Sequence, residues 1–149
     1  MPQVPVAQLK DYIGKELGHS EWLTIDQQRV DRFADCTGDH QFIHVDPEKA
    51  AQTPFGGTIA HGYLTLSLLP MLGEQAFAVD GIGTRLNYGL NRVRFPAPVP
   101  SGGRIRAVFR LKSVEQQGEG RYLVVTEATV ELEGGSRPVC VAEMLVLYL

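Results

Sequence analysis

Hydrophobic residues recur with two different spacings along this chain of 149 residues. In the first half they are spaced as helices require, and in the second half they alternate with polar residues as strands require. A short helix is expected over Val6–Gly14. A second is expected from Thr24, with Gln27 completing a capping box, to Gly38. A third short piece is expected to begin at Asp46-Pro47-Glu48.

The segment His61–Gln75 predicts a different kind of helix. It is apolar on nearly every face, which is typical of a helix that is buried all round. Pro70 falls inside it and is expected to kink or end it.

Four long segments predict strands, and glycine-rich turns separate the last three of them. The strands are expected at Arg85–Phe95, Arg104–Val114, Tyr122–Leu132 and Val139–Leu149. Consecutive hairpins form antiparallel sheets. Helices followed by strands indicate an α+β fold in one domain over residues 1–149, with a long sheet around one buried helix. Pairing across a dimer is one way to protect the edges of such a sheet.

Composition and charge exclude several classes of partner. The formal net charge is −3 with both signs interspersed, so nucleic acid is not an expected partner. No apolar run approaches the ~18 residues of a membrane span, and the first residues lack the pattern of a signal peptide. The two cysteines, Cys36 and Cys140, are expected to be free thiols, and the expected location is the cytoplasm.

Titratable side chains crowd the segment Ala34–Ala50, which lies between two predicted helices. Asp39 follows a glycine at which the backbone must turn, and His44 comes five residues later. A carboxylate and an imidazole can hold one water between them and exchange its protons near neutral pH. The alternative is that Asp39 caps a turn and that His44 is an ordinary surface or core histidine.

The next segment, Pro54–Gly62, is rich in glycine and leads into the buried helix. The first amide groups of a helix have no partners within it and carry partial positive charge. The N–H of Gly62 is therefore a candidate to polarise a carbonyl oxygen, as an oxyanion hole does. The alternative is that these glycines serve only tight turns and close packing.

Other polar residues allow further interpretations. His40, His44, His61 and Asp39 are ligand types for a metal, but the turn at Gly38 argues against a helix that would align them, and no metal is expected. His61 is expected to be structural, bonding to backbone, with a substrate role as the alternative. The pairs Arg92/Arg94 and Arg104/Arg106 suit either the phosphates of coenzyme A or a solvated outer sheet face.

Two stretches together resemble the MaoC-like (R)-specific enoyl-CoA hydratases. They read A-D-C-T-G-D-H-Q-F-I-H-V-D-P-E-K-A and T-P-F-G-G-T-I-A-H-G. The resemblance implies a hot-dog fold, a homodimer and no cofactor, with coenzyme A or acyl carrier protein entering as part of the substrate. It implies that Asp39 accepts a proton from water, that His44 handles the second proton, and that the Gly62 N–H stabilises the enolate-like oxygen.

One departure from the family motif falls beside the catalytic pair. The family's Asn-Pro is Gln41-Phe42 here, as in members that resemble nodulation protein N. Gln41 still offers a side-chain amide, and Phe42 adds an apolar wall. The residues expected to contact substrate are Gln41, Phe42, Gly57, Thr58, Ile59, Ala60, His61 and Asn87.

The sequence is compatible with three functions. The first is addition of water to a trans-2-enoyl thioester to give an (R)-3-hydroxyacyl thioester, or the reverse. The second is cleavage of the thioester by a hot-dog thioesterase, whose sites normally lack a Gly-Asp loop with His five residues on. The third is a non-catalytic subunit that binds acyl thioesters, in which the Asp or the His would tend to be replaced.

Overall fold

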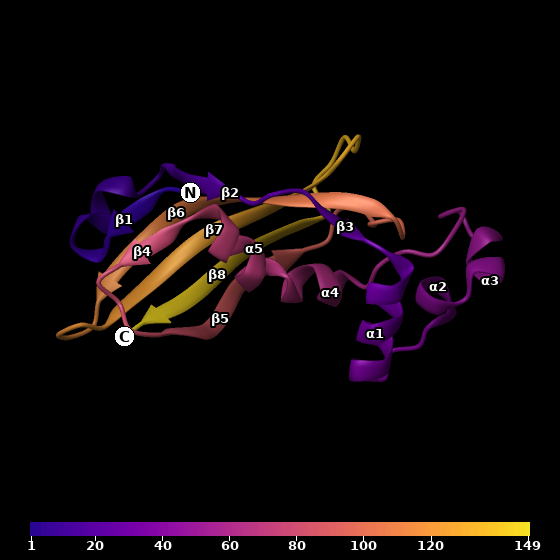
Figure 1. The fold of residues 1–149 in the computed structure, drawn as a ribbon, viewed down its shortest axis with the longest axis horizontal. Helices are drawn as coiled ribbons and strands as arrows, with labels where there is room; N and C mark the ends of the chain where they lie inside the picture. Colours follow the sequence, from indigo (N-terminus) through magenta and orange to yellow (C-terminus); the bar gives the residue numbers. More distant parts are fainter.

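An antiparallel sheet curves around two consecutive helices in the computed structural model, which describes residues 1–149 (Figure 1). The sheet has the order β2-β6-β7-β8-β5, and β3 also pairs with β6. Its strands are β2 (Glu16–His19), β3 (Leu23–Ile25), β5 (Arg85–Arg94), β6 (Gly103–Gln116), β7 (Tyr122–Leu132) and β8 (Cys140–Tyr148). The four long strands predicted from the alternating pattern are confirmed.

The centre of the sheet is built from the hairpins β6–β7 and β7–β8. The first pairs Ile105 with Leu132, and the second pairs Tyr122 with Tyr148. The turns between them are the glycine-containing segments 117–121 and 133–139, where hairpin turns were expected. Every second residue of these strands faces the helices, so the sheet has one largely apolar inner face.

The buried helix is two helices in sequence, α4 (Gly62–Ser67) and α5 (Leu69–Ala76). They meet at Leu68, and Pro70 occupies the first turn of α5, where it removes no hydrogen bond that the helix needs. Proline therefore separates the predicted segment into two helices. Their buried residues pack against the inner face of the sheet; they include Leu64, Leu69, Leu72, Phe109, Leu111, Val124 and Ala142.

Helices α1 (Gln27–Thr37), α2 (Phe42–Val45) and α3 (Pro47–Ala51) lie together beyond one end of the sheet (Figure 1). We call residues 26–61 the overhang. It begins where β3 leaves the sheet and ends where α4 enters the concave face. As predicted, Asp46 caps α3 by accepting from the Lys49 N–H, and Pro47 is its first residue.

The start of α1 differs from the prediction. Thr24 lies in β3 opposite Arg104, so it is paired in the sheet and caps nothing. The N-cap is Asp26, whose carboxylate accepts from the Arg29 N–H at 2.8 Å. The capping-box interpretation of Thr24 was wrong, because a non-local strand pairing took that residue into the sheet.

The chain also holds four short strands before β5 that periodicity did not predict. Besides β2 and β3, the strand β1 (Gln3–Pro5) pairs in parallel with β4 (Ala78–Asp80). The helix expected over Val6–Gly14 is a 3₁₀ helix, η1 (Val6–Tyr12). Strands of three or four residues are too short to display an alternating pattern, which explains why they were missed.

The outermost long strand, β5, has no neighbour on its second edge. Its residues are exposed except for the half-buried Val93. Large apolar side chains on and around it are open to solvent: Tyr63, Leu86, Tyr88, Leu90 and Phe95. A long edge strand with exposed apolar side chains is a strand that another chain can pair with.

Candidate active site

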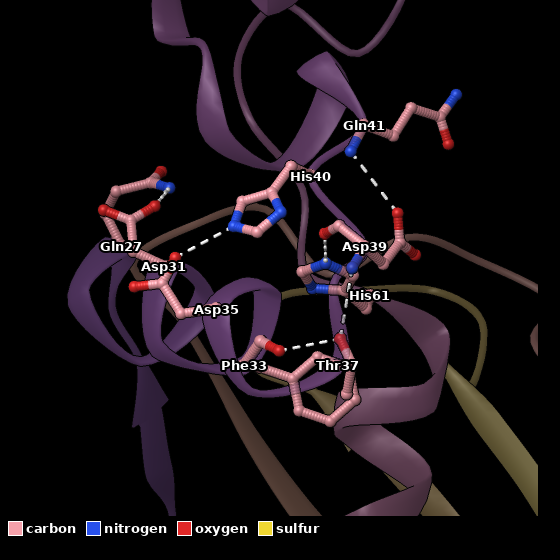
Figure 2. A network of polar contacts seen from close by, with 9 residues as sticks. All are labelled: Gln27, Asp31, Phe33, Asp35, Thr37, Asp39, His40, Gln41 and His61. Atoms are coloured by element: carbon pink, nitrogen blue, oxygen red, sulfur yellow. Dashed lines mark hydrogen bonds and ion pairs between the residues drawn. The ribbon is translucent and has the colours of Figure 1, made fainter.

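Asp39 lies in the loop between α1 and α2, directly after the residue that ends α1. Gly38 has φ 82°, a left-handed conformation that glycine adopts without strain, and its N–H bonds to Ala34 O. Figure 2 shows the carboxylate of Asp39 accepting from the backbone N–H of Gln41 at 3.3 Å. The turn thus presents an exposed carboxylate at the end of α1.

His44 lies in the four-residue helix α2 and is buried. Its Nδ1 is 2.7 Å from the carbonyl oxygen of Ile59. A carbonyl oxygen only accepts, so Nδ1 carries the proton and Nε2 keeps a free lone pair. Burial lowers the pKa of His44, and the neighbouring His61 lowers it further, against the opposing effects of the Ile59 hydrogen bond and of Asp39. His44 is therefore a neutral acceptor at pH 7.

His61 contacts both members of the pair. It is 2% exposed, and its Nε2 donates to the backbone oxygen of Asp39 at 2.9 Å (Figure 2). Its ring stacks on that of His44, with centroids 3.8 Å apart and planes at 24°. The expectation that His61 bonds to backbone is confirmed.

The three side chains converge at one point. A carboxylate oxygen of Asp39, a ring nitrogen of His44 and a ring nitrogen of His61 all lie within 4.8 Å of one another. One water at ordinary hydrogen-bond distance, about 2.8 Å from each partner, can bridge two acceptors at this separation.

The same cluster has the residue types of a metal site, but the stacking opposes one. An ion would need the in-plane lone pairs of both rings to converge about 2.0–2.1 Å away. The two rings lie in nearly parallel planes with centroids 3.8 Å apart, so in-plane lone pairs of both do not meet at one ion, and one nitrogen of each ring already bonds a carbonyl oxygen. The chemistry expected here therefore remains that of protons and water.

Gly62 begins α4 and, with His44, lines a pocket of about 300 Å³. Its N–H makes none of the backbone hydrogen bonds formed outside helices and strands, as expected for a first helical residue. A Cβ at this position would lie 2.9 Å from the Phe95 ring, so only glycine fits without movement. The structure thus places a residue with an unpaired N–H donor and His44 on one pocket.

Gln27, which sequence reasoning assigned to a cap, instead ties the overhang together. Its Nε2 donates to the backbone oxygen of His44 at 2.7 Å, and its Oε1 accepts from the Thr58 hydroxyl at 2.5 Å. Thr58 Oγ1 in turn accepts from the Ser101 hydroxyl at 2.9 Å, because its single proton is already given to Gln27. No sequence signal pointed to this network, because its members are far apart in the chain.

The other residues expected to contact substrate divide into two groups. Ile59 and Ala60 line the pocket with His44 and Gly62. Gln41, Phe42, Gly57, Thr58 and Asn87 do not. Thr58 is buried in the Gln27 network, and Asn87 lines a separate cavity beneath α5. The apolar wall expected from Phe42 comes instead from other residues, which were not singled out: Phe55, Phe95, Pro96, Ala97, Pro98, Val99 and Val139.

Two of the four arginines considered as phosphate ligands, Arg104 and Arg106, form ion pairs with glutamates. Arg104 pairs with Glu133 at 3.0 Å and Arg106 with Glu131 at 2.7 Å, across β6 and β7. This supports the interpretation of that pair as part of a solvated outer face. Arg92 and Arg94 form no ion pair.

Comparison with known proteins adds an independent line of evidence. The sequence pattern of the "MaoC like domain" matches residues 8–134. The chain belongs to the MaoC-like dehydratase family. It is 54% identical over 144 residues to 3-hydroxyacyl-thioester dehydratase Z of Mycobacterium tuberculosis (strain CDC 1551 / Oshkosh), covering 97% of this chain and 95% of that protein.

A further relative supports the family, and a solved structure supports the fold. It is 46% identical to nodulation protein N of Rhizobium leguminosarum bv. viciae, covering 99% of this chain and 92% of the relative. The solved (R)-hydratase of A. caviae involved in PHA biosynthesis superimposes with a TM-score of 0.74 at 23% identity, over 90% of this chain and 94% of that one. The resemblance inferred from the two motifs and the expected hot-dog fold are confirmed.

Two further features of this MaoC-like chain are the state of its cysteines and the length of its helices. Cys36 and Cys140 are both free, as expected, and burial raises the pKa of the Cys140 thiol to about 11. None of the helices is long and apolar enough to cross a membrane.

Proposed function

We propose that this MaoC-like protein adds water to trans-2-enoyl thioesters to give (R)-3-hydroxyacyl thioesters, and catalyses the reverse dehydration. The observation that carries the proposal is the approach of the Asp39 carboxylate and a ring nitrogen of His44 within 4.8 Å. The 54% identity to a protein named as a 3-hydroxyacyl-thioester dehydratase supports the same reaction.

The tautomer of His44 supports a particular route for the proton. Water hydrogen-bonds to the Asp39 carboxylate and to the lone pair on His44 Nε2. As the water oxygen bonds to C3, its proton passes to Nε2, and Nε2 then gives that proton to C2 on the same face. Asp39 orients the water and stabilises the transient imidazolium. The family resemblance implies that Asp39 and His44 each handle one proton, whereas in this route His44 Nε2 takes part in both proton transfers.

The negative charge formed on the thioester during addition needs a donor. The unpaired N–H of Gly62 lines the same pocket as His44, where a carbonyl oxygen can accept from it. A hydrogen bond that strengthens as charge develops lowers the barrier, and such a donor is worth roughly 10²–10³-fold in rate. These steps use only residues of this chain, so we propose a reaction without a cofactor.

Space for the acyl chain lies along α4 and α5. Thr65 lines the catalytic pocket, Leu66 lines a groove beside β5, and Leu69 and Pro70 lie on both that groove and the cavity beneath α5. That cavity has a volume of about 760 Å³ and includes Asn87. We place the tail of a long acyl chain there, which gives Asn87 a substrate contact distant from the reacting carbons. A series of enoyl-CoA chain lengths tests this placement.

We also propose a homodimer joined through β5, which is the unpaired edge of the sheet. Antiparallel pairing of β5 with the same strand of a second copy would satisfy its backbone and cover its exposed apolar side chains. Sedimentation analysis should give twice the chain mass, and Tyr88→Lys should shift the protein toward the monomer. A wild-type protein that sediments as a monomer at all concentrations would overturn the dimer.

The decisive experiment for the reaction mixes the protein with crotonyl-CoA. Hydration removes the absorbance of the conjugated double bond, and chiral analysis of the product identifies the (R) alcohol. Release of free thiol without loss of the double bond would indicate a thioesterase instead. Saturable binding with neither change would indicate a non-catalytic acyl-binding subunit.

A further inference from the structure

His61 carries the one buried side-chain polar atom in this structure that has no hydrogen-bond partner, its Nδ1. The Nε2 of the same ring is bonded to the Asp39 carbonyl oxygen, so Nε2 holds the proton and Nδ1 is a bare acceptor. A buried acceptor without a partner destabilises the fold. A phenylalanine would fill the same space without that penalty, so packing alone does not account for a histidine here.

His61 adjoins each component of the proposed catalytic site. Its Nε2–H holds the backbone of Asp39, and its face stacks on His44. It is also the N-cap residue of α4, directly before Gly62. Phe33 of α1 packs against it, with ring centroids 4.9 Å apart. Four different segments thus meet at one side chain.

The hydrogen bond from His61 ties the Asp39 loop to the end of the overhang, directly before the central helix begins at Gly62. Asp39 is the more exposed member of the pair, and the other side-chain hydrogen bonds of its loop join residues within 35–41. The His44 ring makes one side-chain hydrogen bond, from Nδ1 to Ile59 O. A single bond leaves the ring some freedom to rotate about Cβ–Cγ. The His61 ring lies against the His44 face and limits that rotation.

We propose that His61 is a positioning residue, which sets the separation of the Asp39 carboxylate and His44 Nε2 through its hydrogen bond to Asp39 O and its stacking on His44. This inference rests on the proposed hydration reaction. A displacement of about 1 Å in a reacting group can cost about 10²-fold in rate, so the contact affects turnover more than substrate affinity.

Two substitutions separate the donor from the ring. His61→Phe keeps an aromatic ring against His44 and loses the donor, whereas His61→Gln keeps an N–H near the position of Nε2 and loses the stacking. We expect His61→Phe to lower kcat about 10–100-fold with KM nearly unchanged, and His61→Gln to recover most of that loss. His19→Phe and His19→Gln, at an exposed histidine of β2, are the matched controls.

The pH dependence of kcat distinguishes positioning from proton transfer by His61 itself. If His61 only positions, His61→Gln keeps the shape of the wild-type pH profile. Loss of one limb of the profile would show that His61 moves a proton in the reaction, and it would overturn the proposal. Near-wild-type kcat in a folded His61→Phe variant would also overturn it.

A measurement on the wild-type protein covers the case in which both variants fail to fold. Long-range ¹⁵N–¹H correlation reads histidine tautomers directly. We expect the proton of His61 on Nε2 and that of His44 on Nδ1. The opposite tautomer at His61 would remove the hydrogen bond to Asp39 and with it the proposal. This readout does not depend on activity, so it stands apart from any failure of the proposed reaction.

Discussion

The sheet body and the overhang are held together by different kinds of interaction. The body, β5 to β8 with α4 and α5, has long strand ladders and a continuous apolar core. The overhang has three short helices, few buried apolar side chains and a set of polar contacts across the chain. The proposed site joins the two, with Asp39 and His44 on the overhang and Gly62 on the body. Catalysis in such a site depends on how precisely the overhang docks.

The largest expected effect comes from changing the catalytic pair of the overhang. Asp39→Asn and His44→Ala should each lower hydration of crotonyl-CoA by about 10²–10⁴-fold, because the first loses the charge that stabilises the imidazolium and the second loses the group that transfers the proton. The sheet should remain folded, since its core does not include either residue. Turnover and circular dichroism measured together check this. Near-wild-type turnover in either variant would refute the assignment of the pair.

On the body side, Gly62→Ala should have the next largest effect. The added Cβ would meet Phe95 at 2.9–3.1 Å, so α4 or the ring must move. We expect a loss of about 10-fold, less than the roughly 10²–10³-fold that removal of an oxyanion donor costs, because the N–H is displaced and not deleted. The double variant Gly62→Ala/Phe95→Leu should recover part of the loss. No recovery in a folded double variant would exclude this clash as the cause.

A smaller effect is expected from removing the Gln27 hydrogen bonds, which leaves the catalytic side chains unchanged. Gln27→Ala removes one partner each from His44 O and Thr58 Oγ1, and should lower the free energy of unfolding by about 1–3 kcal/mol. The neighbouring Gln28, which is exposed and makes no side-chain hydrogen bond, is the matched control. Gln28→Ala should stay within about 0.5 kcal/mol of wild type in chemical denaturation. Equal effects of the two substitutions would contradict the role given to Gln27.

The smallest expected effect concerns pH. Burial lowers the pKa of His44 below its ordinary 6.5, so the folded protein favours the neutral ring. The stability from this difference is fully present above pH 6.5 and is lost as the pH falls below that value, because the unfolded chain then binds the proton more readily. His44 must also be neutral to accept a proton from water, so a profile of kcat/KM against pH should decline only below pH 6.5. An acid limb centred above 6.5 would contradict the neutral acceptor role of His44.

The body was the more predictable region, and the reason is local periodicity. In β6 to β8 each second residue faces the core, so the alternation in the sequence records the burial directly. Strand β3 is three residues long and is defined only by its pairing with β6. The cap prediction at Thr24 was wrong because Thr24 pairs with Arg104, a residue far along the chain that no local pattern around Thr24 reveals.

At the proposed site, the sequence by itself determined the identity of the chemical groups. The Gly38-Asp39 turn, His44 five residues later and Gly62 at a helix start are all local features, and together they carried the family resemblance that comparison confirmed. Only the tertiary structure decided how these groups meet. The contact of His61 with Asp39 joins residues 22 apart, and that of Gln27 with His44 joins residues 17 apart. Such contacts depend on how the segments of the overhang pack on one another before the chain enters the central helix. Residues far apart in the chain decide that packing, so no local pattern of side chains predicts it.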